Sequence, residues 1–256
     1  MEIREYVETL DREGRSLAAA AEKAGVDADV VTCADWQVRD LLRHTGMVHR
    51  WATAFVAEGH TSYHPDGGLP DLDHDELLTW FRDGHRRLVD TLADASPDLR
   101  CWSFLPAPSP LAFWARRQAH ETTVHRVDAE SALGGEPTSV APDFAVDGID
   151  ELLRGFHGRE KSAVRTEVPR VLRVRATDRP DAVWTVRLSS EAPHSERGDH
   201  PPTGPDSGEA ADVDCELAGP AAHLYLALWN RVPFPAVTGD AALATLWREK
   251  SAVTWS

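Results

Sequence analysis

Apolar residues recur every three to four positions through the first half of the chain, which is the spacing of amphipathic helices. The first such stretch places them at Ile3, Val7, Leu10, Leu17 and Ala21. Gly25 follows this stretch. Because glycine readily adopts the left-handed conformation that closes many helices, the pattern predicts a first helix that ends near Gly25.

The same spacing predicts three further helices, whose limits follow from a capping sequence, T-C-A-D, and from prolines and glycines. The expected limits are about Thr32–Asp35 to Gly59, from after Pro70 to Pro97, and from Ser109 and Pro110 to Gly134 and Gly135. Helices of about 20 to 25 residues joined by short or moderate loops favour a four-helix bundle.

The pattern changes in the second half of the chain. After a helical stretch at Pro142–Phe156, the sequence VLRVRATDRPDAVWTVRLS alternates with a period of two around the turn Asp178–Asp181, which predicts a hairpin. The stretch Ser189–Ala211 is rich in Pro, Gly, Ser and charge, so we expect an exposed loop there. Strand periodicity returns at Val213–Leu217.

Two short helices are expected near the end of the chain, one from Pro220 to Trp229 and one capped by Asp240. Helices that follow a hairpin and a further strand indicate an α+β domain with an antiparallel sheet. The sequence therefore predicts two domains, residues 1–160 and 161–256.

Composition narrows the function classes. Among 256 residues, 27 Lys and Arg stand against 42 Asp and Glu, a formal charge of −15. Such an acidic surface opposes nucleic-acid backbones and anionic membranes. No apolar stretch is long enough for a bilayer and the first residues are charged, so we expect a cytoplasmic protein without nucleic-acid or membrane partners. Three widely spaced cysteines form no CxxC pair.

Polar residues interrupt the apolar stripe of the fourth predicted helix. At 100° per residue, one face holds Leu111, Trp114, Gln118, Glu121, His125, Asp128 and Ala132. On the second predicted helix, His44 aligns with Leu41, Val48, Trp51 and Phe55, whereas His49 falls about 140° away. On the third, His85 aligns with Phe81, Leu88 and Leu92.

A buried carboxylate at Glu121 needs a hydrogen-bonding or cationic partner. Together with His44 and His125 it forms a set of two imidazoles and one carboxylate, the ligand composition of catalytic zinc sites with an open fourth position. Asp128, one turn beyond His125, is then expected to accept a hydrogen bond that orients a ligand or a nearby Arg. Spacing alone leaves open a structural hydrogen bond or a solvated groove at Glu121 and His125. It also leaves open a core role for His44 and a core or groove-lining role for His85.

Two segments that carry these residues, D-W-Q-V-R-D-L-L-R-H-T-G-M-V-H-R-W (35–51) and R-R-Q-A-H-E-T-T-V-H-R-V-D-A-E (116–130), resemble the mycothiol-dependent maleylpyruvate isomerase family. Later segments, P-D-F-A-V-D-G-I-D-E-L-L (142–153), L-A-L-W-N-R (226–231) and V-T-G-D (237–240), are similar to its C-terminal half. The resemblance implies a DinB-like metal-binding four-helix bundle followed by a sterol-carrier-like α+β domain.

Carried over by position, the resemblance implies metal ligands at His44, Glu121 and His125, the same three residues that the helical spacing selects. It also implies a functional arginine at Arg231, which would bind a substrate carboxylate in a cleft between the domains. The alternative for Arg231 is a residue at a helix end that caps carbonyl groups.

The implied function is a zinc-dependent, or other divalent-metal-dependent, isomerase or S-transferase with mycothiol as the thiol co-substrate. The thiol would be activated as a metal-bound thiolate that attacks a small electrophilic substrate of the maleylpyruvate kind, which carries a carboxylate. Alternatives are a non-catalytic protein that binds a metal or an apolar ligand, and a metal-dependent hydrolase that uses bound water. A fourth protein ligand such as His85 would favour a structural metal. The substrate, the metal and the oligomeric state are not specified by the sequence.

Overall fold

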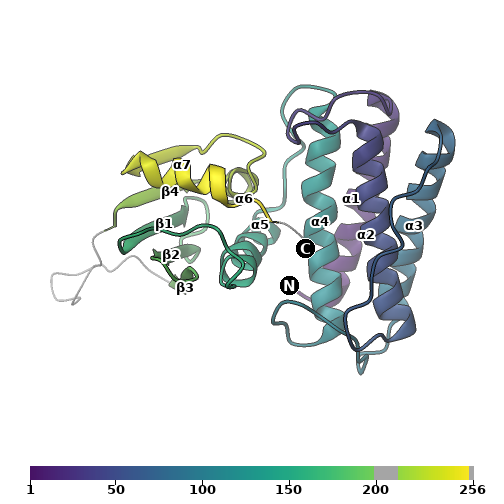
Figure 1. Cartoon of the computed structure of the whole chain (residues 1–256), viewed down its shortest axis with the longest axis horizontal. Helices are drawn as coiled ribbons and strands as arrows, with labels where there is room; N and C mark the ends of the chain where they lie inside the picture. Colours follow the sequence, from purple (N-terminus) through teal and green to yellow (C-terminus); the bar gives the residue numbers. More distant parts are fainter. Residues whose placement is uncertain (199–212, 254–256) are drawn as a thin grey trace. The chain divides into compact units, whose positions relative to one another are not determined.

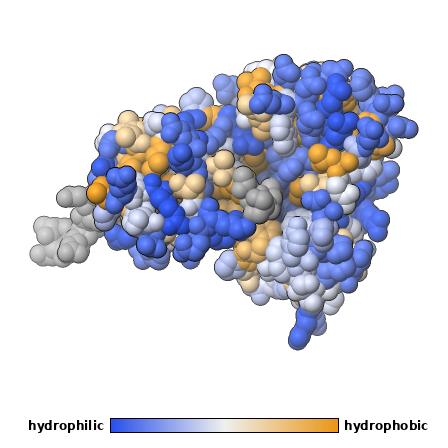
Figure 2. Space-filling model, in the orientation of Figure 1, coloured by the Kyte–Doolittle hydropathy of each residue, from blue (hydrophilic) through white to orange (hydrophobic). Residues whose placement is uncertain are grey.

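The computed structural model describes residues 1–198 and 213–253. The chain divides into two compact units, Met1–Thr138 and Ser139–Ser256, each of which is described by itself. Hydrophilic residues cover most of the face shown in Figure 2, as the charged composition predicts. No helix in the described part of the chain is long and apolar enough to cross a membrane.

The first unit is a bundle of helices, as predicted (Figure 1). Its helices are α1 (Ile3–Ala24), α2 (Val38–Glu58), α3 (His74–Asp94) and α4 (Pro110–Ser131). Helix α4 packs against α1 and α2, and α3 packs against α1 and α2. Their apolar faces meet in a core that includes Leu17, Leu41 and Phe81. This packing places the α2 and α4 stripes next to each other.

Most helix limits follow the predicted capping residues. Gly25, with a φ of +82°, is the C-cap of α1, and Gly59, with a φ of +68°, is the C-cap of α2. At the start of α4, the side-chain oxygen of Ser109 accepts a hydrogen bond from the Ala112 amide (3.1 Å), and Pro110 is the first helical residue. These residues confirm the predicted ends of α1 and α2 and the predicted start of α4.

The predicted start of α2 at Thr32–Asp35 is wrong. Helix α2 begins at Val38, and Gln37 and Asp40 form the capping box. The backbone N–H of Gln37 donates to Asp40 Oδ2 (3.0 Å). Asp35 has a φ of +66°, which lies in the left-handed region and is not compatible with a right-handed α-helix. The residues before it form turns.

The second unit combines helices with a mixed sheet (Figure 1). Its helices are α5 (Pro142–Asp150), which continues as a π-helix (Glu151–Phe156), α6 (Ala221–Leu228) and α7 (Ala241–Lys250). Its described strands are β1 (Arg170–Ala176), β2 (Val183–Leu188), β3 (His194–Gly198), β4 (Cys215–Gly219) and β5 (Ala236–Gly239), in the order β3-β2-β1-β4-β5.

The predicted hairpin is confirmed, since β1 and β2 pair antiparallel with Leu172 opposite Val186. The predicted antiparallel sheet is corrected in one pairing: β4 lies parallel to β1, with Leu172 opposite Cys215. Strand β2 pairs with β1 on one edge and with β3 on the other, so both of its edges are occupied. The next strand, β4, therefore pairs with the free edge of β1.

Part of the predicted loop Ser189–Ala211 is a strand. Strand β3 pairs antiparallel with β2, with Thr185 opposite Glu196. Its side chains are largely exposed, so no apolar alternation marks it in the sequence. The remainder of that predicted loop, residues 199–211, lies outside the described residues.

The division between the units falls before α5, whereas the sequence placed it after residue 160. Helix α5 packs against α6, so its contacts belong to the second unit. Phe144 of α5 lies against Tyr225 of α6, with ring centroids 6.3 Å apart. The helical periodicity of α5 identified the element, and its packing partner assigned it to a unit.

Candidate metal centre

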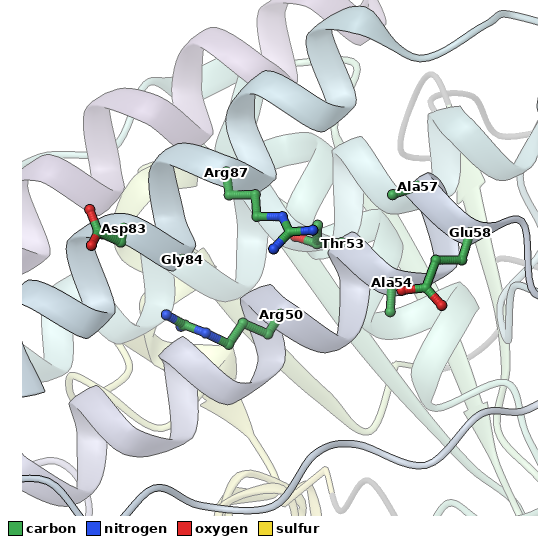
Figure 3. A pocket seen from close by; sticks show the side chains of 8 residues that line it. All are labelled: Arg50, Thr53, Ala54, Ala57, Glu58, Asp83, Gly84 and Arg87. Atoms are coloured by element: carbon green, nitrogen blue, oxygen red, sulfur yellow. The ribbon is translucent and has the colours of Figure 1, made fainter.

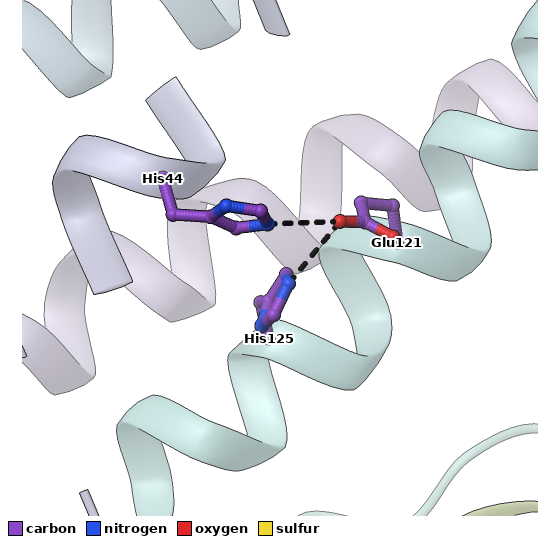
Figure 4. A group of neighbouring side chains, drawn as sticks. All are labelled: His44, Glu121 and His125. Atoms are coloured by element: carbon purple, nitrogen blue, oxygen red, sulfur yellow. Dashed lines mark hydrogen bonds and ion pairs between the residues drawn. The ribbon is translucent and has the colours of Figure 1, made fainter. Parts of the chain in front are cut away.

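Helices α2 and α4 bring together the three residues that the sequence selected (Figure 4). His44 Nε2 lies 3.4 Å from Glu121 Oε1, and His125 Nε2 lies 3.2 Å from the same oxygen. One potential ligand atom from each residue lies within 4.8 Å of the others. Glu121 and His125 are one helical turn apart, and the packing of α2 on α4 supplies His44.

Glu121 is 4% exposed and is surrounded by cationic and hydrogen-bonding groups. Arg117 Nη2 donates to its second oxygen, Oε2, over 3.2 Å. Burial alone would raise the pKa of Glu121, but His125, His44 and Arg117 outweigh it and hold that pKa well below its usual value. The carboxylate is therefore charged, as a metal ligand requires.

Asp128 orients His125. His125 Nδ1 donates to Asp128 Oδ2 over 2.8 Å, while the Thr32 hydroxyl donates to Asp128 Oδ1 over 2.5 Å. Burial lowers the pKa of His125, but Glu121 and Asp128 outweigh it and raise that pKa to about 9. Because Nδ1 is committed to Asp128, Nε2 is the ring nitrogen directed at the Glu121 carboxylate.

Trp36 packs against both imidazoles of the cluster. Its ring centroid lies 5.2 Å from that of His44 and 6.3 Å from that of His125, where the rings are nearly parallel. Arg117 and Trp36 were not selected from the sequence. An arginine four residues before a buried glutamate is a signal that could have identified Arg117.

The other two histidines considered from the sequence lie elsewhere in the bundle. His49 is fully buried, off the His44 stripe as expected, and its Nε2 bonds to the Thr122 hydroxyl (2.9 Å). His85 packs on His49, with centroids 5.5 Å apart, and its Nε2 lies 3.2 Å from the Asp11 carbonyl oxygen. His85 is not part of the cluster, so it does not supply the fourth ligand.

Arg231 follows α6 in the second unit. Its Nη1 donates to the carbonyl oxygen of Trp229 over 2.6 Å, and its backbone N–H donates to the carbonyl oxygen of Leu226. This contact matches the alternative role of capping a helix end. A role in binding substrate stays a prediction.

A separate pocket of about 330 Å³ lies between α2 and α3 (Figure 3). Its lining side chains include Arg50, Thr53, Glu58, Asp83 and Arg87. Arg50 lies over the Trp80 ring, 3.7 Å from its centroid, and donates to the Trp80 carbonyl. None of the pocket's lining residues belongs to the His44, Glu121 and His125 cluster.

The fold and the cluster define a two-unit protein whose helical bundle carries a candidate metal site. Residues 7–130 match the model of the mycothiol maleylpyruvate isomerase N-terminal domain, and residues 143–246 match the model of the family's C-terminal domain. The chain therefore belongs to the mycothiol-dependent maleylpyruvate isomerase family, which confirms the resemblance found in the sequence.

A solved structure shares the fold. It is the crystal structure of a histidine-to-alanine mutant of a mycothiol-dependent maleylpyruvate isomerase, with a TM-score of 0.58 and 11% sequence identity over 88% of each chain. No curated protein matches the sequence.

Proposed function

We propose that this chain is a metal-dependent, mycothiol-dependent isomerase or S-transferase that acts on a small electrophile carrying a carboxylate, such as maleylpyruvate. The observation that carries the proposal is the convergence of His44, Glu121 and His125, whose ligand atoms lie within 4.8 Å of one another. Family membership supports the reaction class.

The donor set fits a zinc ion. Two imidazole nitrogens and one carboxylate oxygen are ligands that zinc uses in catalytic sites. In a tetrahedral site with bonds of about 2.0–2.1 Å, ligand atoms lie roughly 3.3–3.4 Å apart. The two separations from Glu121 Oε1 are 3.4 Å to His44 and 3.2 Å to His125. Modest shifts of these side chains would therefore suffice.

The remaining site residues would hold the ligands in place. Asp128 fixes the ring of His125 through Nδ1, and Arg117 holds the oxygen of Glu121 that does not face the imidazoles. Trp36 packs on the two imidazoles and would limit the access of water from that side. When bound, a divalent cation would lower the pKa of a ligating thiol, so that mycothiol reacts as its thiolate near neutral pH.

In the isomerase reaction, the thiolate sulfur forms a bond to one carbon of the cis double bond, and the π electron pair moves onto the adjoining carbonyl group as an enolate, so the former double bond is single and can rotate. Return of that electron pair expels the sulfur and restores the double bond in the trans geometry, so the thiolate is regenerated. In the transferase reaction, the adduct takes up a proton and is the product. Arg231 is proposed to bind the substrate carboxylate in either case.

A catalytic role is favoured over a structural metal or a simple binding module. Among residues 1–198 and 213–253, the candidate ligand group contains three side chains and no fourth. Structural zinc sites are commonly closed by four protein ligands, whereas catalytic sites keep one position for substrate or water. A water-activating hydrolase would use the same ligands, and binding of mycothiol distinguishes it.

Metal analysis tests the ligand assignment. The wild type is expected to hold one zinc ion, and His44→Ala and Glu121→Gln should lose stoichiometric zinc because each removes a ligand. His223→Ala, which changes an exposed histidine in the second unit, is the matched control and should retain zinc. Full zinc occupancy in both ligand variants would contradict the assignment.

Calorimetry tests the co-substrate. Mycothiol should bind the zinc-loaded protein and lose affinity after chelation, because its sulfur needs the metal. Metal-independent binding would contradict the mechanism.

Steady-state kinetics test the role of Arg231 toward the electrophile. Arg231→Ala should raise the KM for the electrophile more than it lowers kcat, and unchanged kinetics with an acidic substrate would remove the role of Arg231.

A further inference from the structure

A buried amide without a partner lies one helical turn before Glu121. Gln118 of α4 has 0% exposure, and neither its Nε2 nor its Oε1 forms a hydrogen bond among the described residues. An amide removed from water without compensation costs about 1–3 kcal/mol. Both Nε2 and Oε1 of Gln118 lack a partner, so this cost is incurred at two atoms of one side chain. A hydrogen-bonding partner bound during function, such as a ligand, would remove it.

Gln118 lies on the α4 stripe that faces α2. At 100° per residue, it falls within 60° of both Trp114 and Glu121 around the helix axis. The stripe meets α2 on both sides of Gln118: Glu121 contacts His44, and Trp114 packs on Trp51 with centroids 5.3 Å apart. Gln118 therefore lies along α4 between the metal-ligand cluster and an aromatic pair.

The stripe that carries Gln118 favours a neutral polar ligand group. On the side away from Glu121 it holds the aromatic pair, and the facing stripe of α2 holds Val48 between His44 and Trp51, all uncharged. The guanidinium of Arg117 is engaged with the carboxylate of Glu121. A substrate carboxylate placed here would compete with Glu121 for that cation, whereas an amide or hydroxyl group needs no counter-charge.

We propose that the Gln118 amide binds a neutral amide or hydroxyl group of the thiol co-substrate and so positions the co-substrate's sulfur beside His44, Glu121 and His125. An amide side chain offers a donor and an acceptor side by side, which complements a secondary amide or a hydroxyl group. This inference rests on the proposed function and identifies which reactant the residue recognises: the thiol and not the acidic electrophile.

The test measures mycothiol binding and stability in the same variants. Gln118→Leu removes both hydrogen-bonding atoms at similar volume, and Gln118→Glu keeps the shape but loses the donor. In the zinc-loaded protein, each should weaken mycothiol binding about tenfold by calorimetry, with zinc stoichiometry unchanged. Without mycothiol, Gln118→Leu should raise the melting temperature by about 2–4 °C, because a buried group without a partner is removed.

Thr45→Val is the matched control. Thr45 is also fully buried, and its hydroxyl has no hydrogen-bond partner among the described residues, but it lies about 100° around α2 from His44. This variant should also raise the melting temperature and should leave mycothiol affinity unchanged. The KM for mycothiol should rise in the Gln118 variants, while the KM for the electrophile stays constant.

Wild-type mycothiol affinity in Gln118→Leu and Gln118→Glu would overturn the inference and would assign Gln118 to a buried water. Loss of zinc from either variant would also overturn it, since Gln118 would then act on the metal site. A wild-type protein that binds zinc but not mycothiol would instead overturn the proposed function, and this inference with it.

Discussion

At the scale of single residues, charge neutralisation explains the candidate metal centre. Glu121 is buried, and it stays ionised because two imidazoles and the Arg117 guanidinium surround it. Helical spacing placed Glu121 and His125 on one face of α4 and His44 on the apolar stripe of α2, because residues three or four apart share a helix face. The family resemblance then selected these three residues as candidate ligands. The contribution of Trp36 was not readable, since this residue precedes α2 and reaches the cluster only through the turns before that helix.

Asp128→Asn is predicted to weaken zinc binding by about 10- to 100-fold, because it removes the negative charge that accepts the His125 Nδ1 hydrogen. Competition with a chromophoric chelator measures this affinity. Asp98→Asn, at an exposed position of the same unit, is the control and should bind zinc normally. Equal affinities of the two variants would argue against an orienting role for Asp128.

At the scale of elements, close approaches between helices explain glycines that local propensity disfavours. Gly14 lies within α1, and a Cβ built there would be 2.3 Å from Cε1 of His85 on α3. Similarly, a Cβ at Gly46 of α2 would be 2.2 Å from the Trp80 ring. Glycine within a helix costs roughly 0.5–1 kcal/mol relative to alanine, so packing and not helix formation accounts for these positions.

Gly14→Ala is predicted to destabilise the first unit by about 1–3 kcal/mol despite alanine's higher helix propensity, because His85 is buried and cannot move into solvent. Denaturant unfolding measures the change. Gly67→Ala is the control, since a Cβ at Gly67 meets no atom within 4 Å. A Gly14→Ala protein more stable than the wild type would show that α1 and α3 can separate at little cost.

At the scale of the whole molecule, the two family models fall within the two units, residues 7–130 in the first and 143–246 in the second. The candidate metal ligands all belong to the first unit, whereas Arg231 belongs to the second. In the second unit, a buried histidine, His157, packs on Trp247 with ring centroids 4.7 Å apart.

The lowered pKa of buried His157 predicts that the second unit loses stability in mild acid. Burial, together with the nearby Arg159, lowers the pKa of His157 from 6.5 to about 4. Between these values the unfolded chain binds a proton that the folded chain does not. Stability is thus complete above pH 6.5 and falls below it, by up to about 1.4 kcal/mol per pH unit.

The matched variant is His157→Asn, which cannot titrate but can still bond to the Ser162 hydroxyl, the partner of His157 Nδ1 at 3.0 Å. Hydrogen exchange of the β1 and β2 amides measures the stability of the second unit at each pH. The wild type should lose protection relative to the variant as the pH falls from 6.5 to 4. Parallel pH profiles would contradict the assignment.

The sequence by itself predicted the helices of the bundle and the β1–β2 hairpin, because periodicity and capping act over a few residues. Spacing together with the family resemblance also nominated the three candidate ligands. Only the tertiary structure decided the parallel pairing of β4 with β1, the strands β3 and β5, and the assignment of α5 to the second unit. Strands β3 and β5 expose most of their side chains and are held by backbone hydrogen bonds, which leave no apolar pattern. Likewise, only packing of α2 on α4 decided that the Gln118 amide lies buried without a partner beside the candidate ligands.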